Sequence, residues 1–204
     1  MSERFVGSKI EELPQQENTM SETPITKVCV TGGNGYLGSW VVFYLLEQGY
    51  NVKCTVRSLS KEDSYKHLIG LPGATDDHRL EICEARLEDK EAWASVLEDC
   101  QAIIHCASPR PHFIPEDEMD LVYPALEGTI GIMTTALAMK INKIILTGDI
   151  CNVRGAKYSA NYTEDDWADI DPKLSPYEKS KILAERCALN FTQEQHKNCE
   201  TIVL

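Results

Sequence analysis

The sequence predicts an α/β protein with one doubly wound parallel sheet, in which helices cover both faces. Three observations lead to this prediction. Short apolar runs of strand length alternate along the chain with longer runs of helical periodicity. The apolar runs are nearly continuous, as expected for parallel strands that are buried on both sides. A glycine-rich segment joins the first strand-like run to the first helical one.

The length and charge of the chain limit its organisation and its partners. A chain of 204 residues is long enough for one domain and short for two. We expect residues 1–25 to form a flexible polar leader and residues 26–204 to form the domain. The net charge of -12 argues against nucleic acid and anionic membrane surfaces as partners. We find no uninterrupted apolar run near the roughly 20 residues that membrane insertion requires.

The chain contains eight cysteines, and their spacing bears on metal binding and on the compartment. None of them forms a CxxC pair or a Cys/His cluster at zinc-site spacing, so we expect no metal site. Several lie inside apolar runs, where a free thiol behaves as a small hydrophobic group. This usage predicts reduced thiols in the cytoplasm.

The first half of the domain is expected to contain three strands and two helices. KVCVT is a short β-branched run, which is typical of a buried strand. The helix that follows it ends at Gly49, because glycine commonly terminates helices. We therefore expect strands at residues 27–31, 51–56 and 79–83, and helices at residues 35–48 and 61–69.

The second half continues the alternation up to the last residues of the chain. The pattern predicts helices at residues 90–97, 121–139 and 177–191, and strands at residues 102–106, 143–147 and 200–204. Because strand and helix alternate five times, the strands must run parallel within one sheet.

The loop after the first strand, TGGNGYLG, has glycines spaced as G-x-x-G-x-x-G at Gly32, Gly35 and Gly38. Gly32 permits a tight turn, Gly35 allows a pyrophosphate to approach the backbone, and Gly38 allows close helix packing. The helix that follows offers free N–H groups and a positive dipole end to an anion. The segment predicts a Rossmann-type dinucleotide site; a glycine-rich structural turn is the alternative.

Arg57 stands at the end of the second predicted strand. An acidic residue there would bind the adenosine ribose and favour NAD(H), whereas an arginine can pair with a 2′-phosphate. The position therefore favours NADP(H) over NAD(H), unless Arg57 is only a solvated surface residue.

Tyr177 and Lys181 lie four residues apart on a predicted helix, and residues at this spacing share one face. A nearby ammonium group lowers the pKa of a phenol, so Tyr177 could pass a proton near neutral pH. We interpret the pair as catalytic; an ordinary pair on a helix surface is the alternative.

With these segments in view, the chain resembles the extended short-chain dehydrogenase/reductase family of the NAD-dependent epimerase/dehydratase superfamily. It is most similar to the branch of dihydroflavonol reductases and cinnamoyl-CoA reductases. The resemblance covers about residues 27–204. It rests on VTGGNGYLGSWVV, TVRS followed by HLIGLP, HCASP with PALEGT, and PYEKSKILAE.

The resemblance implies an NADP-dependent oxidoreductase, in which NADPH gives a hydride to the carbonyl carbon of a small aldehyde or ketone. Tyr177 would protonate the carbonyl oxygen, and Lys181 would hydrogen-bond the nicotinamide ribose. The cofactor-binding residues implied by the resemblance are Gly32, Gly35, Tyr36, Leu37, Gly38, Arg57, Leu87, Ala107, Ser108 and Lys181.

The sequence departs from the family pattern at the fifth strand. The family has a serine there that hydrogen-bonds the substrate and the tyrosine, whereas this chain has Asp149. If Asp149 points into the site, catalysis should suffer, because an ionised carboxylate cannot donate a hydrogen bond and disfavours a phenolate. Alternatively, Asp149 turns away and Thr147 or a water takes the serine's place. Arg86 stands where the family has an adenine-contacting aspartate.

The chain is also shorter than members of this family, which run to roughly 300 residues or more. We expect either a fragment or a protein that kept only the nucleotide-binding half. Two functions follow: an NADP-dependent carbonyl reductase of impaired or normal activity, or a non-catalytic Rossmann subunit with a structural or nucleotide-sensing role in a larger assembly. In the second case a protein partner would cover the open C-terminal side. A nucleotide-sugar epimerase or dehydratase is a third reading, which Arg57 disfavours.

Overall fold

The computed structural model describes residues 25–75, 77–110, 115–155, 161–163, 165–195 and 199–204. The expected leader at residues 1–25 lies almost wholly outside this part of the chain. The described residues form a six-stranded sheet in the order β3-β2-β1-β4-β5-β6, and every neighbouring pair is parallel. The strands are β1 (Lys27–Thr31), β2 (Asn51–Val56), β3 (Leu80–Glu84), β4 (Ala102–His105), β5 (Lys143–Leu146) and β6 (Glu200–Val203).

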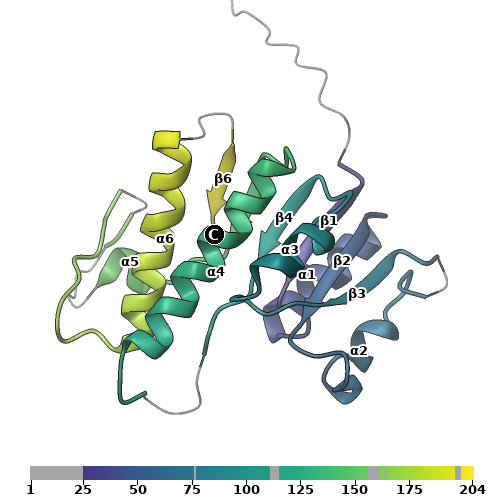
Figure 1. Ribbon diagram of the computed structural model, residues 1–204, viewed down its shortest axis with the longest axis horizontal. Helices are drawn as coiled ribbons and strands as arrows, with labels where there is room; N and C mark the ends of the chain where they lie inside the picture. The colour runs from purple at the N-terminus through teal and green to yellow at the C-terminus, as the bar shows by residue number, and fades with distance from the viewer. Residues whose placement is uncertain (1–24, 76, 111–114, 156–160, 164, 196–198) are drawn as a thin grey trace, which may run out of the picture.

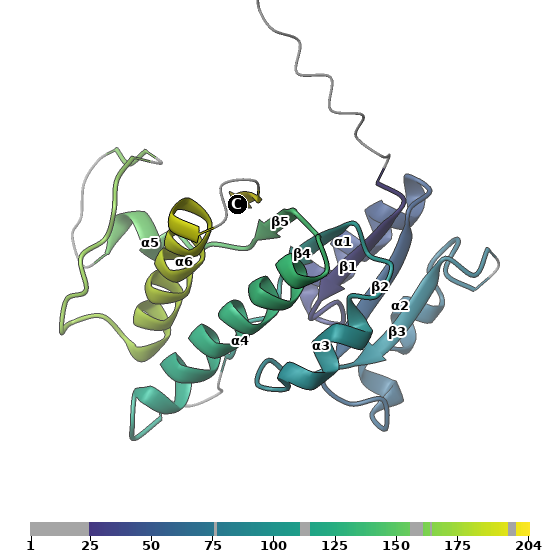
Figure 2. The same cartoon turned by 45° about the horizontal axis from the view of Figure 1, so that its top comes forward.

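Helices cover both faces of this sheet, as expected for a doubly wound fold. They are α1 (Tyr36–Glu47), the 3₁₀ turn η1 (Glu62–Ser64), α2 (Lys66–Ile69), α3 (Lys90–Val96), α4 (Met119–Ala138), α5 (Cys151–Arg154) and α6 (Pro176–Gln195). Figure 1 and Figure 2 both show α4 and α6 side by side, with α2 and β3 at the other end of the molecule. The predicted Rossmann-type fold is confirmed.

Two hydrophobic cores lie on the two faces of the sheet, and neighbouring residues of one strand contribute to different cores. Cys29 of β1 belongs to the core beneath α3, α4 and α6. The next residue, Val30, belongs to the core beneath α1 and α2. This alternation follows from the two-residue period of a strand, and it explains why the strands read as nearly continuous apolar runs.

The predicted helices need correction in two places, between β2 and β3 and after β5. The helix expected at residues 61–69 is instead two short pieces, η1 and α2. Tyr65 separates them because its φ of -133° lies outside the helical range. The short helix α5 was not predicted at all. Helix α6 ends at Gln195, four residues beyond its predicted end at residue 191, and the other strand and helix ends agree with the predictions within two residues.

Helix α4 is long and apolar enough to meet the length and composition criteria for a membrane-spanning helix, although the sequence shows no uninterrupted apolar run of that length. Half of its most apolar segment is buried within the protein. Ile132 and Met133 of α4 lie in the core that also contains Trp93 of α3 and Ala188 of α6. These contacts are those of a core helix, which passes the same test.

The sheet is covered unevenly at its β6 edge. The core beneath α1 and α2 takes residues from β1 to β4 but none from β5 or β6. Ile202 of β6 is 38% exposed, and the last residue, Leu204, is 77% exposed. Apolar side chains therefore reach the surface on this side of the described structure.

Candidate functional site

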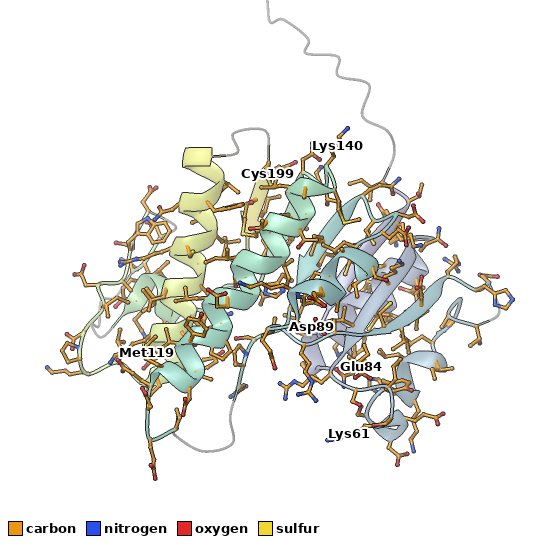
Figure 3. All side chains as sticks on the ribbon, viewed as in Figure 1. Lys61, Glu84, Asp89, Met119, Lys140 and Cys199 are labelled. Carbon is orange, nitrogen blue, oxygen red and sulfur yellow. The ribbon has the colours of Figure 1, made fainter. Side chains whose placement is uncertain are left out.

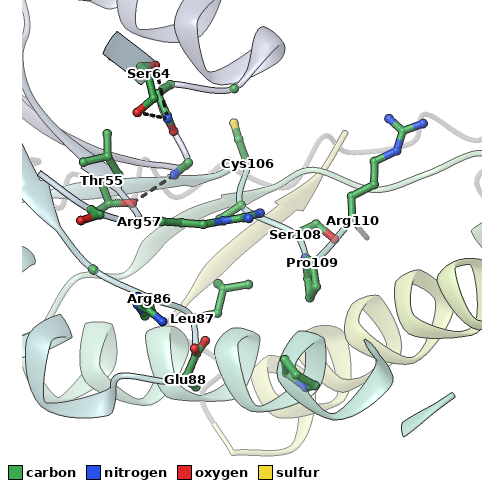
Figure 4. A pocket seen from close by; sticks show the side chains of 18 of the residues that line it. Thr55, Arg57, Ser64, Arg86, Leu87, Glu88, Cys106, Ser108, Pro109 and Arg110 are labelled. Atoms are coloured by element: carbon green, nitrogen blue, oxygen red, sulfur yellow. Dashed lines mark hydrogen bonds between the residues drawn. The ribbon is translucent and has the colours of Figure 1, made fainter. Parts of the chain in front are cut away.

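The carboxyl ends of the central strands open into a pocket of about 1410 Å³. Such pockets are the usual ligand sites of doubly wound sheets, and this one exceeds the roughly 300–1,000 Å³ typical of small-molecule pockets. Figure 4 shows the side chains that converge on it from β2, β3 and β4. Of the residues predicted to hold a cofactor, those lining the pocket are Gly32, Gly35, Arg57, Leu87, Ala107 and Ser108.

The glycine loop forms the wall of this pocket next to β1. Gly32 has a φ of +64°, and a Cβ there would lie 3.0 Å from the Cα of Ala107. At Gly38 a Cβ would lie 2.4 Å from the carbonyl oxygen of Gly32, so only glycine allows α1 to start so close to the loop. Gly35 precedes the first residue of α1 and supplies no side-chain cap. The first-turn N–H groups of α1 are therefore left for another acceptor, such as a phosphate.

A contact with β2, which the sequence did not predict, holds the loop in place. The N–H of Gly32 donates to Thr55 Oγ1 at 3.0 Å, and the N–H of Gly33 donates to the carbonyl oxygen of Thr55 at 3.1 Å. A Cβ on Gly33 would lie 2.1 Å from Cys54 Sγ, so this glycine allows the loop to pack on β2. No local pattern could reveal this, since the partners are more than 20 residues apart.

Two further polar residues contribute to the same wall. The Nδ2 of Asn34 lies 3.4 Å from the carbonyl oxygen and from the hydroxyl of Ser64, and these contacts are drawn in Figure 4. Both residues line the pocket. They tie the glycine loop to the segment that follows β2.

The charged residues of the pocket are mostly cations. Arg57 and Lys61 follow β2, Arg86 follows β3, and Arg110 follows β4. Figure 4 shows Arg86 and Arg110 at opposite ends of the pocket. Of these four cations, only Arg57 was predicted from the sequence to bind the cofactor, although Lys61 is four residues further on. The acidic lining residues are Glu88 and Asp120.

Tyr177 lies in the first turn of α6, where a capping box fixes the start of the helix. The N–H of Ser175 donates to Glu178 Oε2 at 2.9 Å, and the N–H of Glu178 donates to Ser175 Oγ at 3.3 Å. Pro176 occupies the first helical position, where its missing N–H costs nothing. The start of α6 is thus well determined, and with it the position of Tyr177.

The hydroxyl of Tyr177 donates to Asp149 Oδ2 at 3.3 Å, and the N–H of Cys151 donates to Asp149 Oδ1 at 3.0 Å. Of the two orientations considered for Asp149, the structure has the one directed at Tyr177. Partial burial would raise the pKa of Asp149, but the hydrogen bonds from Cys151 and Tyr177 bring it below its usual value. Burial, and then the Asp149 carboxylate, raise the pKa of Tyr177 above its usual value.

The expected lowering of the Tyr177 pKa by Lys181 is therefore wrong for this structure. Lys181 Nζ donates to the carbonyl oxygen of Thr147 at 2.7 Å, and burial lowers the pKa of Lys181. The cation that lowers the pKa of Tyr177 is Arg110, whose guanidinium carbon lies 5.9 Å from the centre of the ring. Arg110 was missed, although it directly follows the Ala-Ser-Pro segment that was expected to line the cofactor.

Lys181 also lines a second cavity of about 20 Å³, together with Ala107, Ser108 and His105. His105 Nδ1 lies 2.7 Å from Thr31 Oγ1. Burial, and then Lys181, lower the pKa of His105 to about 4, so its ring is neutral at physiological pH. Two predicted cofactor contacts, Tyr36 and Leu37, have side chains that are 87% and 48% exposed, and neither lines a cavity described above.

Comparison with known proteins places this site in a family context. The sequence model of the NAD dependent epimerase/dehydratase family matches residues 28–204. Cinnamoyl-CoA reductase CAD2 from Medicago truncatula is 36% identical over 183 residues, which cover 86% of this chain and 56% of that protein. Dihydroflavonol 4-reductase from Arabidopsis thaliana is 32% identical over 176 residues, covering 82% of this chain and 46% of that protein.

Among solved structures, Gre2 from Candida albicans in complex with NADPH matches with a TM-score of 0.74 at 27% identity. The match covers 87% of this chain and 56% of that protein. The chain thus spans about half the length of the relatives it matches.

Proposed function

The chain belongs to the NAD dependent epimerase/dehydratase family, in the branch of the dihydroflavonol and cinnamoyl-CoA reductases, and from this premise we propose that it binds NADP(H) and reduces the carbonyl group of a small molecule. The observation that carries the proposal is that the glycine loop and Arg57 meet in one large pocket. Eight unpaired cysteines favour a reducing compartment such as the cytoplasm.

The pocket suits a dinucleotide phosphate on three counts. Its volume is ample, its glycine loop leaves no room for side chains, and the start of α1 carries no side-chain cap. Arg57, Lys61 and Arg86 place three cations beyond neighbouring strands β2 and β3, which suits the 2′-phosphate that distinguishes NADP(H) from NAD(H). Gre2, a structural relative, was crystallised with NADPH. When bound, NADPH supplies the hydride.

The residues around Tyr177 would handle the proton of this reaction. Tyr177 carries a hydroxyl proton, its ring lies beside the pocket residue Arg110, and it would pass the proton to the carbonyl oxygen of the substrate. Lys181 is oriented by the carbonyl oxygen of Thr147, so its ammonium is held beside the end of β5. Asp149 opposes this reaction, because it accepts the same hydroxyl proton that the substrate needs. We therefore propose a slow reductase.

A second candidate function is a non-catalytic nucleotide-binding subunit. The contact between Asp149 and Tyr177 favours it, because it opposes turnover and leaves nucleotide binding unaffected. The two candidates share nucleotide binding and differ in turnover.

The testing experiment is calorimetric titration of the chain with NADPH and NADH, with Gly35→Asp and Arg57→Gln as variants. Gly35→Asp should abolish binding, because its carboxylate would repel the pyrophosphate at the loop. Arg57→Gln should weaken NADPH binding about 10- to 100-fold, the range for a hydrogen bond to a charged group, and leave NADH binding nearly unchanged. If the folded chain binds neither nucleotide, both candidate functions fail. Binding without turnover of any aldehyde favours the non-catalytic subunit.

A further inference from the structure

The pocket has the opposite charge balance to the rest of the chain. The whole chain has 20 basic and 32 acidic residues, yet among the described residues the pocket is lined by four basic and two acidic ones. A concave site that gathers cations raises the local concentration of anions. Three of the four cations follow β2 or β3 and are accounted for by a nucleotide phosphate. A nucleotide phosphate does not account for the fourth cation, Arg110.

Arg110 is separated from the other cations by the topology of the sheet. It follows β4, and β4 lies on the other side of β1 from β2 and β3. Figure 4 shows its side chain at the far end of the pocket from Arg86. A 2′-phosphate held by Arg57 and Arg86 would therefore lie away from Arg110, which faces the catalytic end of the site.

The guanidinium of Arg110 is placed over Tyr177 and is available to a ligand. Its carbon lies 5.9 Å from the ring centre. Within the described part of the chain the contact of Arg110 is with the Tyr177 ring, and it makes no hydrogen bond or ion pair there, with Asp120 or any other residue. A guanidinium with free N–H groups beside an aromatic ring is suited to binding a carboxylate through two parallel hydrogen bonds.

We infer that the preferred substrates are aldehydes or ketones that carry a carboxylate, which Arg110 binds while the carbonyl group lies at the Tyr177 hydroxyl. This inference rests on the proposed function and specifies its substrate class. Asp149 supports the same orientation, because its carboxylate adjoins the hydroxyl of Tyr177 and repels a second carboxylate there. The anionic end of the substrate is thus directed to Arg110 and the neutral carbonyl to Tyr177.

The experiment compares two aldehydes that differ only in charge, 4-carboxybenzaldehyde and methyl 4-formylbenzoate. With NADPH, the wild-type chain should show a kcat/KM about tenfold or more higher for the acid, mainly through a lower KM. Arg110→Gln should abolish this preference, and Arg110→Lys should keep part of it because the charge remains while the planar fork is lost. NADPH affinity of each variant is measured alongside.

The matched control is Lys140→Asn, which removes one positive charge beyond the far end of α4, about 30 Å from its first turn at Met119 (Figure 3). Lys140 has a φ of +64°, which asparagine tolerates. This variant should keep the preference for the acid. If it loses the preference as Arg110→Gln does, net charge and not Arg110 is responsible, and the inference fails.

Failure of this inference is distinguishable from failure of the proposed function. Turnover of both aldehydes with equal kcat/KM would overturn the inference and leave the reductase standing. If neither aldehyde is reduced, calorimetric titration of the NADP⁺-saturated chain with 4-carboxybenzaldehyde decides the matter. Binding that Arg110→Gln weakens about tenfold supports a carboxylate site in a non-catalytic protein. Binding that is absent, or unaffected by Arg110→Gln, overturns the inference.

Discussion

The Asp149→Ser variant should reduce aldehydes faster than the wild-type chain. In the wild type, the Tyr177 hydroxyl donates to the carboxylate of Asp149 at 3.3 Å, so its proton is directed away from the substrate. Serine removes the charge and can itself donate a hydrogen bond to the carbonyl oxygen of the substrate. The pKa of Tyr177 should also fall, since the Asp149 carboxylate is a main cause, after burial, of its elevation.

The size of the gain can be estimated from the geometry of this contact. A hydrogen bond to a charged group contributes about 1.5–3 kcal/mol net. The 3.3 Å distance is long for an O–H···O⁻ bond, and Asp149 is only partly buried. The lower end of that range therefore applies, and about 1.5 kcal/mol corresponds to roughly a tenfold increase in kcat.

The assay is steady-state oxidation of NADPH with an aromatic aldehyde, and Asp149→Ala is its matched control. Alanine removes the competing acceptor without supplying a donor, so kcat should rank serine above alanine and alanine above aspartate. Because the N–H of Cys151 also uses Asp149 as an acceptor, the stability and NADPH affinity of each variant must be measured too. A serine variant that folds and binds NADPH as the wild type does, yet has an equal or lower kcat, would refute this reasoning.

Two further predictions concern stability. Gly38→Ala should destabilise the chain by about 2–3 kcal/mol and abolish NADPH binding, because its Cβ would meet the carbonyl oxygen of Gly32 at 2.4 Å. Urea unfolding measures the loss of stability. The control is Gly70→Ala, whose Cβ would lie 3.8 Å from the nearest atom and which should change stability by less than about 1 kcal/mol. His105 has a folded pKa of about 4 against about 6.5 unfolded, so the unfolded state binds its proton first. The free energy of unfolding that depends on neutral His105 is fully present above about pH 6.5 and is lost as the pH falls towards 4. The total loss is about 3 kcal/mol. His105→Gln should lack this share of the acid sensitivity, and an unchanged pH dependence of unfolding would contradict the assignment.

The sheet could be predicted from the sequence because each strand carries its own signal. KVCVT, NVKCTV and KIIL are short and rich in β-branched residues, and parallel strands covered on both faces need no alternation. The prediction failed where the local signal is weak. Residues 61–69 begin with the polar run Lys61–Ser64, none of which is buried, so no apolar face holds a continuous helix there. The four-residue helix α5 is too short to show a period.

The site divides in the same way between local and distant determinants. The glycine loop was predictable because the turn, the phosphate approach and the helix start all lie within eight consecutive residues. The surroundings of Tyr177 were not predictable, because they come from the ends of β4, β5 and α6. Spacing alone placed Lys181 on the face of Tyr177, but it could not show that Thr147 orients the ammonium or that Arg110 reaches the ring.

The two ends of the pocket should therefore respond to mutation independently. At the nucleotide end the site is shaped by close contacts between backbone atoms, such as the carbonyl oxygen of Gly32 packed on Gly38. Side-chain substitutions elsewhere leave these contacts in place. At the catalytic end the determinants are two side chains of opposite charge, Asp149 and Arg110, that act on one hydroxyl. Replacing either charge changes the chemistry of Tyr177 without altering the loop. Substitutions of Asp149 or Arg110 can therefore change turnover and substrate preference while nucleotide binding stays the same. Across such variants, nucleotide affinity and kcat should be uncorrelated.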